Sequence, residues 1–144
     1  MILVTGANGQ MGRSLRKILP QDKVIYTDLA ELDISVYDGV EKMIRENGVS
    51  TVINAAGYTA VDSAEKNMDQ AYAVNALGAR NLAMASAKHN CGMIQLSTDY
   101  IFDGNNFKPY TENDKPHPLS VYGQTKLEGE LFTLKHAPQC VVLR

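Results

Sequence analysis

"ILVTGANGQMG", residues 2–12, is the part of the chain from which its architecture is most directly inferred. A short apolar run leads into Gly6, Gly9 and Gly12, and residues 10–19 then carry apolar side chains at helical spacing. A strand, a glycine-rich turn and a helix in this order are typical of a dinucleotide-binding α/β sheet. Gly6 permits the tight turn, Gly9 lets backbone approach a pyrophosphate, and Gly12 lets the helix pack closely.

Beyond this segment, strand-like and helix-like stretches alternate along the chain. Apolar runs predict strands over residues 23–28, 49–57, 92–98 and 140–144, with a short additional strand at 32–34. Helical spacing predicts helices over residues 35–47, capped by Ser35, 69–89 and 120–136, with a loop over 99–117. Apolar strands separated by helices indicate an α/β fold, a doubly wound, Rossmann-like parallel sheet with helices on both faces. We expect residues 1–144 to form one NAD(P)-binding domain.

The composition excludes several classes of function. A net charge of −2 provides no basic footprint for nucleic acid, and no apolar run approaches the ~20 residues of a membrane span. The two cysteines have no metal-ligand spacing, and the three histidines are dispersed, so we expect no metal site. Reduced, buried thiols are the simplest interpretation of Cys91 and Cys140, and a cytoplasmic location follows as the expectation.

The second predicted strand ends in Asp28, about twenty residues after the first glycine. An acid at this position accepts hydrogen bonds from an adenosine ribose, although a strand-end acid also stabilises ordinary turns. Asp33 and Ile34 are candidates to flank the adenine. The segment "NAAGYT", residues 54–59, has small side chains that leave room for the middle of a cofactor, with Tyr58 packing against it.

Tyr122 and Lys126 are four residues apart in a predicted helix and so share one face. A phenol with its ordinary pKa of about 10 is a poor proton donor at neutral pH, and a nearby ammonium improves it by stabilising the phenolate. Ser97 and Thr98 offer hydroxyls at the carboxyl end of a strand, where ligands bind in such sheets. Alone, such a pair is common by chance and indicates little more than two polar residues on a helix surface; behind a glycine-rich turn and a strand that ends in Ser97 and Thr98, it favours acid–base chemistry.

Several longer motifs, in family order, resemble the extended short-chain dehydrogenase/reductase superfamily and, within it, the dTDP-4-dehydrorhamnose reductases. These motifs cover nearly the whole chain: "TGANGQMG", "ELDI", "INAAGYTAVDSAE", "VNALGARNLA", "STDYIFDG" and "PLSVYGQTKLEGE". The resemblance implies reduction of a nucleotide-sugar 4-ketone by hydride from a reduced nicotinamide. It also implies a dTDP-keto-sugar as partner, and it leaves a homodimer possible.

The resemblance also implies roles for individual residues. Tyr122 matches the proton donor, Lys126 the residue that assists it and binds the nicotinamide ribose, and Thr98 the hydroxyl that orients the ketone, with Asp99 holding the sugar. Asn75 matches a family asparagine, for which we expect a buried hydrogen-bonding role between loops. The cofactor contacts that it implies are Gly9, Gln10 and Met11 at the pyrophosphate, Asp28, Asp33 and Ile34 at the adenosine, and Gly57, Tyr58 and Thr59 along the middle.

Two alternatives stay open for the activity, and one for the cofactor. A related nucleotide-sugar epimerase or dehydratase, or a non-catalytic regulatory subunit, would share the glycine turn and the Tyr122–Lys126 pair. Asp28 would repel a 2′-phosphate and favours NADH, whereas Arg13 would attract one and favours NADPH, which the resemblance also implies. The family continues past Arg144 into a substrate domain, so this chain is expected to be truncated, binding a dinucleotide but turning over poorly.

Overall fold

The computed structural model describes all 144 residues and contains one five-stranded parallel sheet with the strand order β2-β1-β3-β4-β5. The strands are β1 (Ile2–Thr5), β2 (Val24–Thr27), β3 (Thr51–Asn54), β4 (Gly92–Leu96) and β5 (Cys140–Leu143). Because β2 lies on one side of β1 and β3 on the other, the winding reverses between β1 and β3. The predicted doubly wound α/β fold is therefore confirmed.

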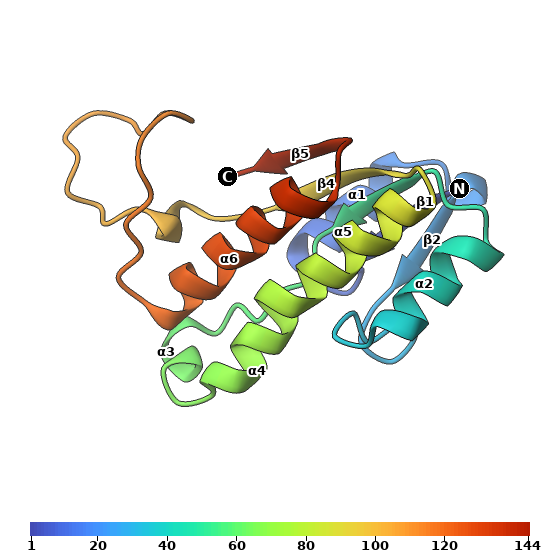
Figure 1. Cartoon of the computed structure of the whole chain (residues 1–144), viewed down its shortest axis with the longest axis horizontal. Coiled ribbons are helices and arrows are strands. Elements are labelled where there is room, and N and C mark those ends of the chain that lie inside the picture. Colours follow the sequence, from blue (N-terminus) through green and yellow to red (C-terminus); the bar gives the residue numbers. More distant parts are fainter.

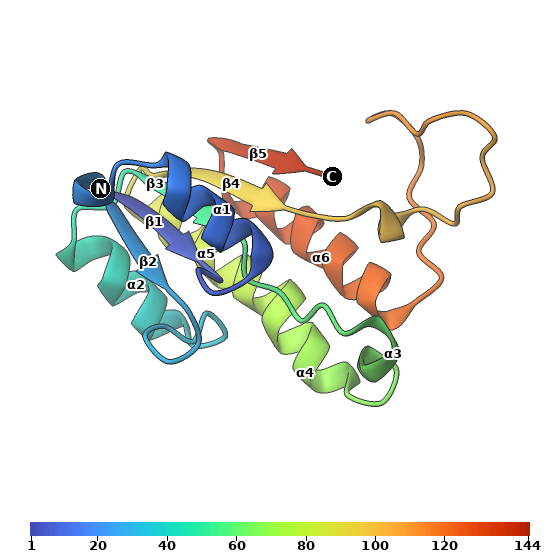
Figure 2. The same cartoon turned by 180° about the vertical axis from the view of Figure 1, so that it is seen from behind.

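Helices cover both faces of the sheet, but unequally. The helices are α1 (Gln10–Ile18), α2 (Tyr37–Glu46), α3 (Val61–Ala64), α4 (Met68–Tyr72), α5 (Ala79–Lys88) and α6 (Val121–His136). Figure 1 shows α2, α5 and α6 in front of the sheet, and Figure 2, from behind, shows α1 on the opposite face. This division follows from the strand order, because a crossover between parallel strands is right-handed and its helix changes face when the winding reverses.

The main core lies between the sheet and the helices α2 and α5. Leu3, Val52 and Met93 are in register on β1, β3 and β4, and they pack with Ile44 and Leu82 into one buried cluster. On the other face, β5 exposes Val141 at 54% and Leu143 at 49%. The side of the sheet that α5 covers is thus the better packed one.

From Met68 to Lys88, helical structure is continuous but irregular. After α4, residues Ala73–Gly78 form the π-helical segment η2, which leads directly into α5. The predicted helix over residues 69–89 is therefore present, with one wider segment in it. A π-helical segment is rare and is often found at functional sites.

Two local predictions were wrong. Residues 32–34 do not form a strand, because the Asn81 side chain donates to the carbonyls of Ile34 (3.0 Å) and Ser35 (2.9 Å) in place of a neighbouring strand. Ser35 does not cap the next helix, since its hydroxyl donates to Asp33 and the helix begins at Tyr37. The short helices α3 and Gln21–Lys23 were not expected, and each predicted strand is longer than the observed one.

The predicted loop after β4 holds one short helical turn, Asp99–Ile101, and residues 102–120 then project from the body of the fold (Figure 1). Phe102 and Tyr110 stack with ring centroids 4.2 Å apart, and the Tyr110 hydroxyl donates to Asp103 at 2.9 Å. These contacts hold the two arms of the loop together. The loop connects the end of β4 with the start of α6. Ser120, where this helix was predicted to begin, is its N-cap.

Candidate functional site

The glycine-rich turn between β1 and α1 lies against the end of β3. Gly6 has φ = +67°, and a Cβ there would lie 2.5 Å from the Ala56 nitrogen and 2.6 Å from the Ala55 oxygen. A Cβ at Gly12 would collide with the Gly6 carbonyl oxygen. Glycine at these two positions therefore lets the turn, the helix and β3 approach one another closely.

The first turn of α1 presents unsatisfied backbone donors. Gly9 is its N-cap and contributes no side-chain cap, so the amides of Gln10, Met11 and Gly12 have no partner within the helix. No acidic side chain occupies this first turn. Together with the helix dipole, free amides of this kind favour a negatively charged group such as a pyrophosphate.

A cavity of 780 Å³ opens beside this turn, at the edge of the sheet where the strands end. It is lined by ten of the thirteen residues predicted to bind a cofactor: Gly6, Gly9, Gln10, Met11, Asp28, Asp33, Ile34, Gly57, Tyr58 and Thr59. The other three predicted residues, Gly12, Tyr122 and Lys126, do not line it. The structure thus brings together residues from four separate segments of sequence around one hollow.

Seven further residues of the cavity wall were not named in advance: Ser14, Leu29, Leu32, Ala55, Ala56, Gln70 and Val74. Ala55 and Ala56 belong to the small-residue segment after β3, so that segment contained the relevant signal. Gln70 and Val74 come from α4 and η2, and no sequence pattern distinguishes them from other helical residues.

Asp28 has a defined position at the end of β2. Its carboxylate accepts hydrogen bonds from the amides of Asn8 and Leu29, at 2.8 and 2.9 Å, which fixes its orientation. The Glu31 carboxylate accepts from the Asp28 amide at 2.9 Å, so a second acid lies next to Asp28. Free lone pairs on Asp28 suit the hydroxyls of a ribose.

A buried row of polar side chains crosses the carboxyl ends of three strands. Thr5, Asn54 and Gln95 are paired in register, and each is 1% exposed. The Thr5 hydroxyl donates to Asn54 (2.7 Å), and Asn54 donates to Gln95 (2.8 Å). Gln95 in turn donates to the Leu96 carbonyl at 2.9 Å. This row continues the hydrogen bonding of the sheet through its side chains.

Lys126 meets the end of that row from α6. Its ammonium donates to the same Leu96 carbonyl at 2.6 Å, and the residue is 6% exposed. Burial lowers the pKa of the Lys126 ammonium to about 8, an effect partly offset by the Glu130 carboxylate one turn further along α6. Glu130 is itself buried and is paired with Arg144 at 2.8 Å. Lys126 is therefore a protonated but poorly hydrated base at neutral pH.

Tyr122 and Thr98 lie near the start of α6 and the end of β4. Tyr122 is 8% exposed and packs edge-on against Tyr100, with ring centroids 5.5 Å apart. The Thr98 hydroxyl accepts from the Tyr100 amide and donates to Asp99, both at 3.2 Å. Tyr100 thus contacts both of the predicted catalytic hydroxyl residues, while Asp99 stays exposed at the site.

Asn75, on η2, joins the cavity wall to α6. Its side chain accepts from the Tyr58 amide (2.8 Å) and donates to the Tyr58 carbonyl (3.2 Å) and to the Thr125 hydroxyl (3.0 Å). The expected buried hydrogen-bonding role is confirmed, although Asn75 joins one loop to the helix α6 and does not join two loops.

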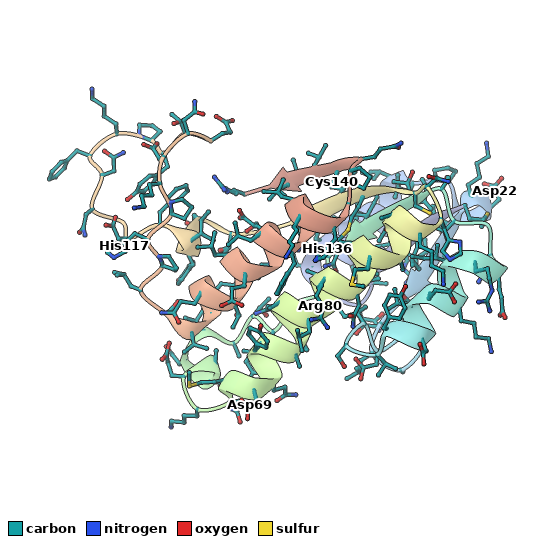
Figure 3. All side chains as sticks on the ribbon, viewed as in Figure 1. Asp22, Asp69, Arg80, His117, His136 and Cys140 are labelled. Atoms are coloured by element: carbon teal, nitrogen blue, oxygen red, sulfur yellow. The ribbon has the colours of Figure 1, made fainter.

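The remaining chemistry-bearing residues are separate from one another. Figure 3 shows His117 on the projecting loop and His136 near the end of α6, and no group of three His, Cys, Asp or Glu is placed to hold a metal ion. Cys91 is buried and Cys140 half-buried, and both are free thiols. None of the helices is long and apolar enough to cross a membrane.

A doubly wound sheet, a cavity at its winding reversal and a Tyr–Lys pair on the helix beside it define a Rossmann-like protein of the short-chain dehydrogenase/reductase class. Residues 1–144 match the family described as the RmlD substrate binding domain, and the chain belongs to that family.

Relatives of known name agree with this assignment. The chain is 44% identical, over 99% of its length, to a dTDP-4-dehydrorhamnose reductase from Aggregatibacter actinomycetemcomitans, of which it covers 50%. The crystal structure of a Clostridium acetobutylicum dTDP-4-dehydrorhamnose reductase matches 98% of the chain at 45% identity and a TM-score of 0.95, and the chain covers 51% of it. The Bacillus anthracis reductase in complex with NADP matches with the same TM-score and coverage at 36% identity. The chain thus spans about half the length of the relatives it matches.

Proposed function

We propose that the protein containing this chain reduces the 4-keto group of dTDP-4-dehydro-β-L-rhamnose to give dTDP-L-rhamnose, with NADPH as the hydride source. The observation that carries the proposal is the cavity at the winding reversal of the sheet, with the predicted cofactor residues around it. The similarity to dTDP-4-dehydrorhamnose reductases, one of them in complex with NADP, supports the choice of substrate and cofactor.

The residues present fit a nicotinamide dinucleotide. The free amides at the start of α1 suit its pyrophosphate, because they supply donors and a favourable dipole without an opposing acid. Asp28 suits the adenosine ribose, and Ile34, buried at the cavity wall, suits a face of the adenine. When bound, the nicotinamide would supply the hydride.

In this proposal Tyr122 gives its phenolic proton to the oxygen at C4 of the sugar. Lys126 is protonated below its pKa of about 8, and its charge on the same helix face stabilises the phenolate that remains. Thr98 orients the ketone through its hydroxyl, and Asp99 is a candidate to hold the sugar. The burial of Lys126 strengthens its electrostatic effect, since less water screens the charge.

The choice between the two nicotinamide cofactors depends on opposing charges. Asp28 lines the cavity, and Glu31 accepts a hydrogen bond from its amide; both carboxylates would repel a 2′-phosphate on the ribose that we assign to Asp28, which favours NADH. Arg13 is exposed on the first turn of α1, outside the residues that line the cavity, and it is the nearest basic residue in sequence to the glycine turn. We propose that the protein uses NADPH and also accepts NADH.

The test of the reaction uses this chain in excess over dTDP-4-dehydrorhamnose, so that slow chemistry is visible, with NADPH present and products identified by mass spectrometry. We expect dTDP-L-rhamnose to form. With Tyr122→Phe, which removes the acid, we expect the rate of formation to fall by about 100-fold or more. Leu131→Ala, an exposed position on the same helix, is the control. An unchanged rate with Tyr122→Phe, or a sugar altered elsewhere than at C4, contradicts the proposal.

A further inference from the structure

Thr125 lies between Tyr122 and Lys126 in the sequence of α6 and is buried. Its hydroxyl donates to the Tyr122 carbonyl at 2.9 Å, one turn earlier in the same helix. The same oxygen accepts from the Asn75 side chain at 3.0 Å, across the boundary between α6 and η2. Thr125 is thus the one residue between the proposed acid and its lysine whose side chain is bonded to another element.

Asn75 links Thr125 to the cavity wall through its hydrogen bonds with Tyr58. Its amide oxygen accepts from the Tyr58 amide, while its two N–H groups donate to the Tyr58 carbonyl and to Thr125. Both donors of the amide are therefore in use, and their acceptors fix which way the side chain faces. Removing the Thr125 hydroxyl would leave one buried N–H of Asn75 without a partner, a costly state for a buried polar group.

We call the hydrogen bonds that run from Tyr58 through Asn75 to Thr125 the Asn75 bracket. The elements that this bracket joins are in close contact. A Cβ at Gly57 would lie 3.3 Å from the Asn75 amide oxygen and 3.9 Å from the Lys126 ammonium nitrogen, so the loop after β3 borders directly on Lys126. A Cβ at Gly129 would collide with the Asn75 carbonyl oxygen, so α6 and η2 are equally close. A small movement of α6 against the loop would therefore change the distance between Lys126 and the cavity wall.

We propose that Thr125 is a positioning residue, which acts through Asn75 to hold Tyr122 and Lys126 at a fixed distance from the cofactor-facing loop Gly57–Thr59. The inference rests on the proposed function, because it assigns this loop and Lys126 to one dinucleotide site. The bracket spans the loop that lines the cavity and the helix that carries the acid, two parts that are 50 residues apart in sequence at the Asn75–Thr125 bond.

The chain contains a matched control on the same helix. Thr133 is also buried and also donates its hydroxyl to a carbonyl one turn earlier, that of Gly129 at 2.8 Å. Its hydroxyl has no partner on another element. Thr125→Val and Thr133→Val therefore lose the same kind of intrahelical bond and gain the same methyl group, and only the first breaks the bracket.

The experiment measures NADPH affinity by calorimetry and Tyr58 amide exchange by NMR for the wild type, Thr125→Val, Thr125→Ser and Thr133→Val, at a temperature where all four are folded. We expect Thr125→Val to weaken NADPH binding about fivefold to tenfold and to speed Tyr58 exchange by a similar factor. Thr125→Ser, which keeps the hydroxyl, should restore both values to within about twofold of the wild type. Thr133→Val should change neither by more than about twofold, even if it lowers stability.

Two results would overturn the proposal: equal effects of Thr125→Val and Thr133→Val, or no recovery in Thr125→Ser. Failure of the wild type to bind any dinucleotide would refute the proposed function instead. The exchange of the Tyr58 amide in the cofactor-free chain would then still decide whether Thr125 holds the bracket, and an unchanged rate in Thr125→Val would reject it.

Discussion

At the scale of single residues, Lys126 is the least conventional feature of the chain. A lysine that is 6% exposed loses most of its hydration, and the Leu96 carbonyl replaces only part of it. Its pKa falls from 10.5 to about 8 because burial disfavours the charged form. The same burial that would make Lys126 effective beside Tyr122 is thus expected to lower the stability of the fold.

The sign of this effect sets the first prediction, for Lys126→Met. Between pH 8 and 10.5 the unfolded chain holds the proton on Lys126 more tightly than the folded chain, so the wild type gains stability as the pH rises through that window. At about pH 7 the variant should be more stable by roughly 1–3 kcal/mol, and the difference should shrink by about pH 10. Urea unfolding at both pH values measures it. A variant that is less stable than the wild type near neutral pH would contradict the account of Lys126.

The second prediction concerns cofactor choice and the charges near α1 and β2. Arg13→Ala should weaken NADPH binding about fivefold to tenfold while leaving NADH nearly unaffected, because only NADPH carries the 2′-phosphate. Lys17→Ala is the control, since Lys17 is a cation of the same helix and is also exposed. Equal losses for both cofactors, or the same effect from Lys17→Ala, would contradict a role for Arg13 in cofactor choice.

Much of the cavity could be predicted from single residues, because certain backbone conformations and close contacts require particular residue types. Gly6 is required by its positive φ and by the closeness of β3. Asp28 directly follows β2, about twenty residues after that glycine. Gln70 and Val74 could not be predicted, because they reach the cavity only through the way α4 and η2 pack. That packing cannot be inferred from the spacing of residues in the sequence.

At the scale of elements, the buried polar row of Thr5, Asn54 and Gln95 ties three strands together beneath the cavity. Buried strands of a parallel sheet are normally rich in apolar residues, so three buried polar residues in one register position are unusual. Their hydrogen bonds run in one direction and end at the Leu96 carbonyl, where Lys126 also binds. The row therefore helps to fix the strand ends that support the site.

The third prediction tests whether this row acts as a unit. Asn54→Leu should cost about 2–4 kcal/mol of unfolding free energy, because it leaves Thr5 and Gln95 with unpaired buried groups. The triple variant Thr5→Val, Asn54→Leu, Gln95→Leu should cost less than the sum of its three single changes, since no buried partner is left behind. Denaturant unfolding of the four variants gives both values. Additive losses would show that the three residues act independently.

The order and type of the elements could be predicted from apolar runs and helical spacing, but their local form could not. Residues 32–34 have the composition of a strand, yet the Asn81 side chain takes the hydrogen bonds that a neighbouring strand would have provided. The π-helical segment Ala73–Gly78 likewise lies at a tertiary contact, where the Asn75 carbonyl packs directly against Gly129 of α6. Both deviations occur where elements meet beside the cavity.

At the scale of the whole molecule, the chain forms by itself the part of the fold to which we assign the cofactor. The sheet, the glycine turn and the 780 Å³ cavity are formed by residues within this chain, which spans about half the length of its relatives. The packing is concentrated on the face covered by α2, α5 and α6, and Figure 2 shows β4 and β5 with no helix in front of them on the other face. From that second face, α1 contributes Gln10, Met11 and Ser14 to the cavity.

Calorimetric titration of the chain with NADPH, and separately with NADH, tests the central claim most directly. The account predicts saturable binding of one dinucleotide per chain with a Kd on the order of micromolar, with NADPH preferred and NADH also accepted. Gly9→Val, which places a side chain at the proposed pyrophosphate contact, should abolish binding of both while the chain stays folded. Absence of binding by either cofactor to the folded wild-type chain, or undiminished binding by Gly9→Val, would contradict the assignment of this cavity to a nicotinamide dinucleotide.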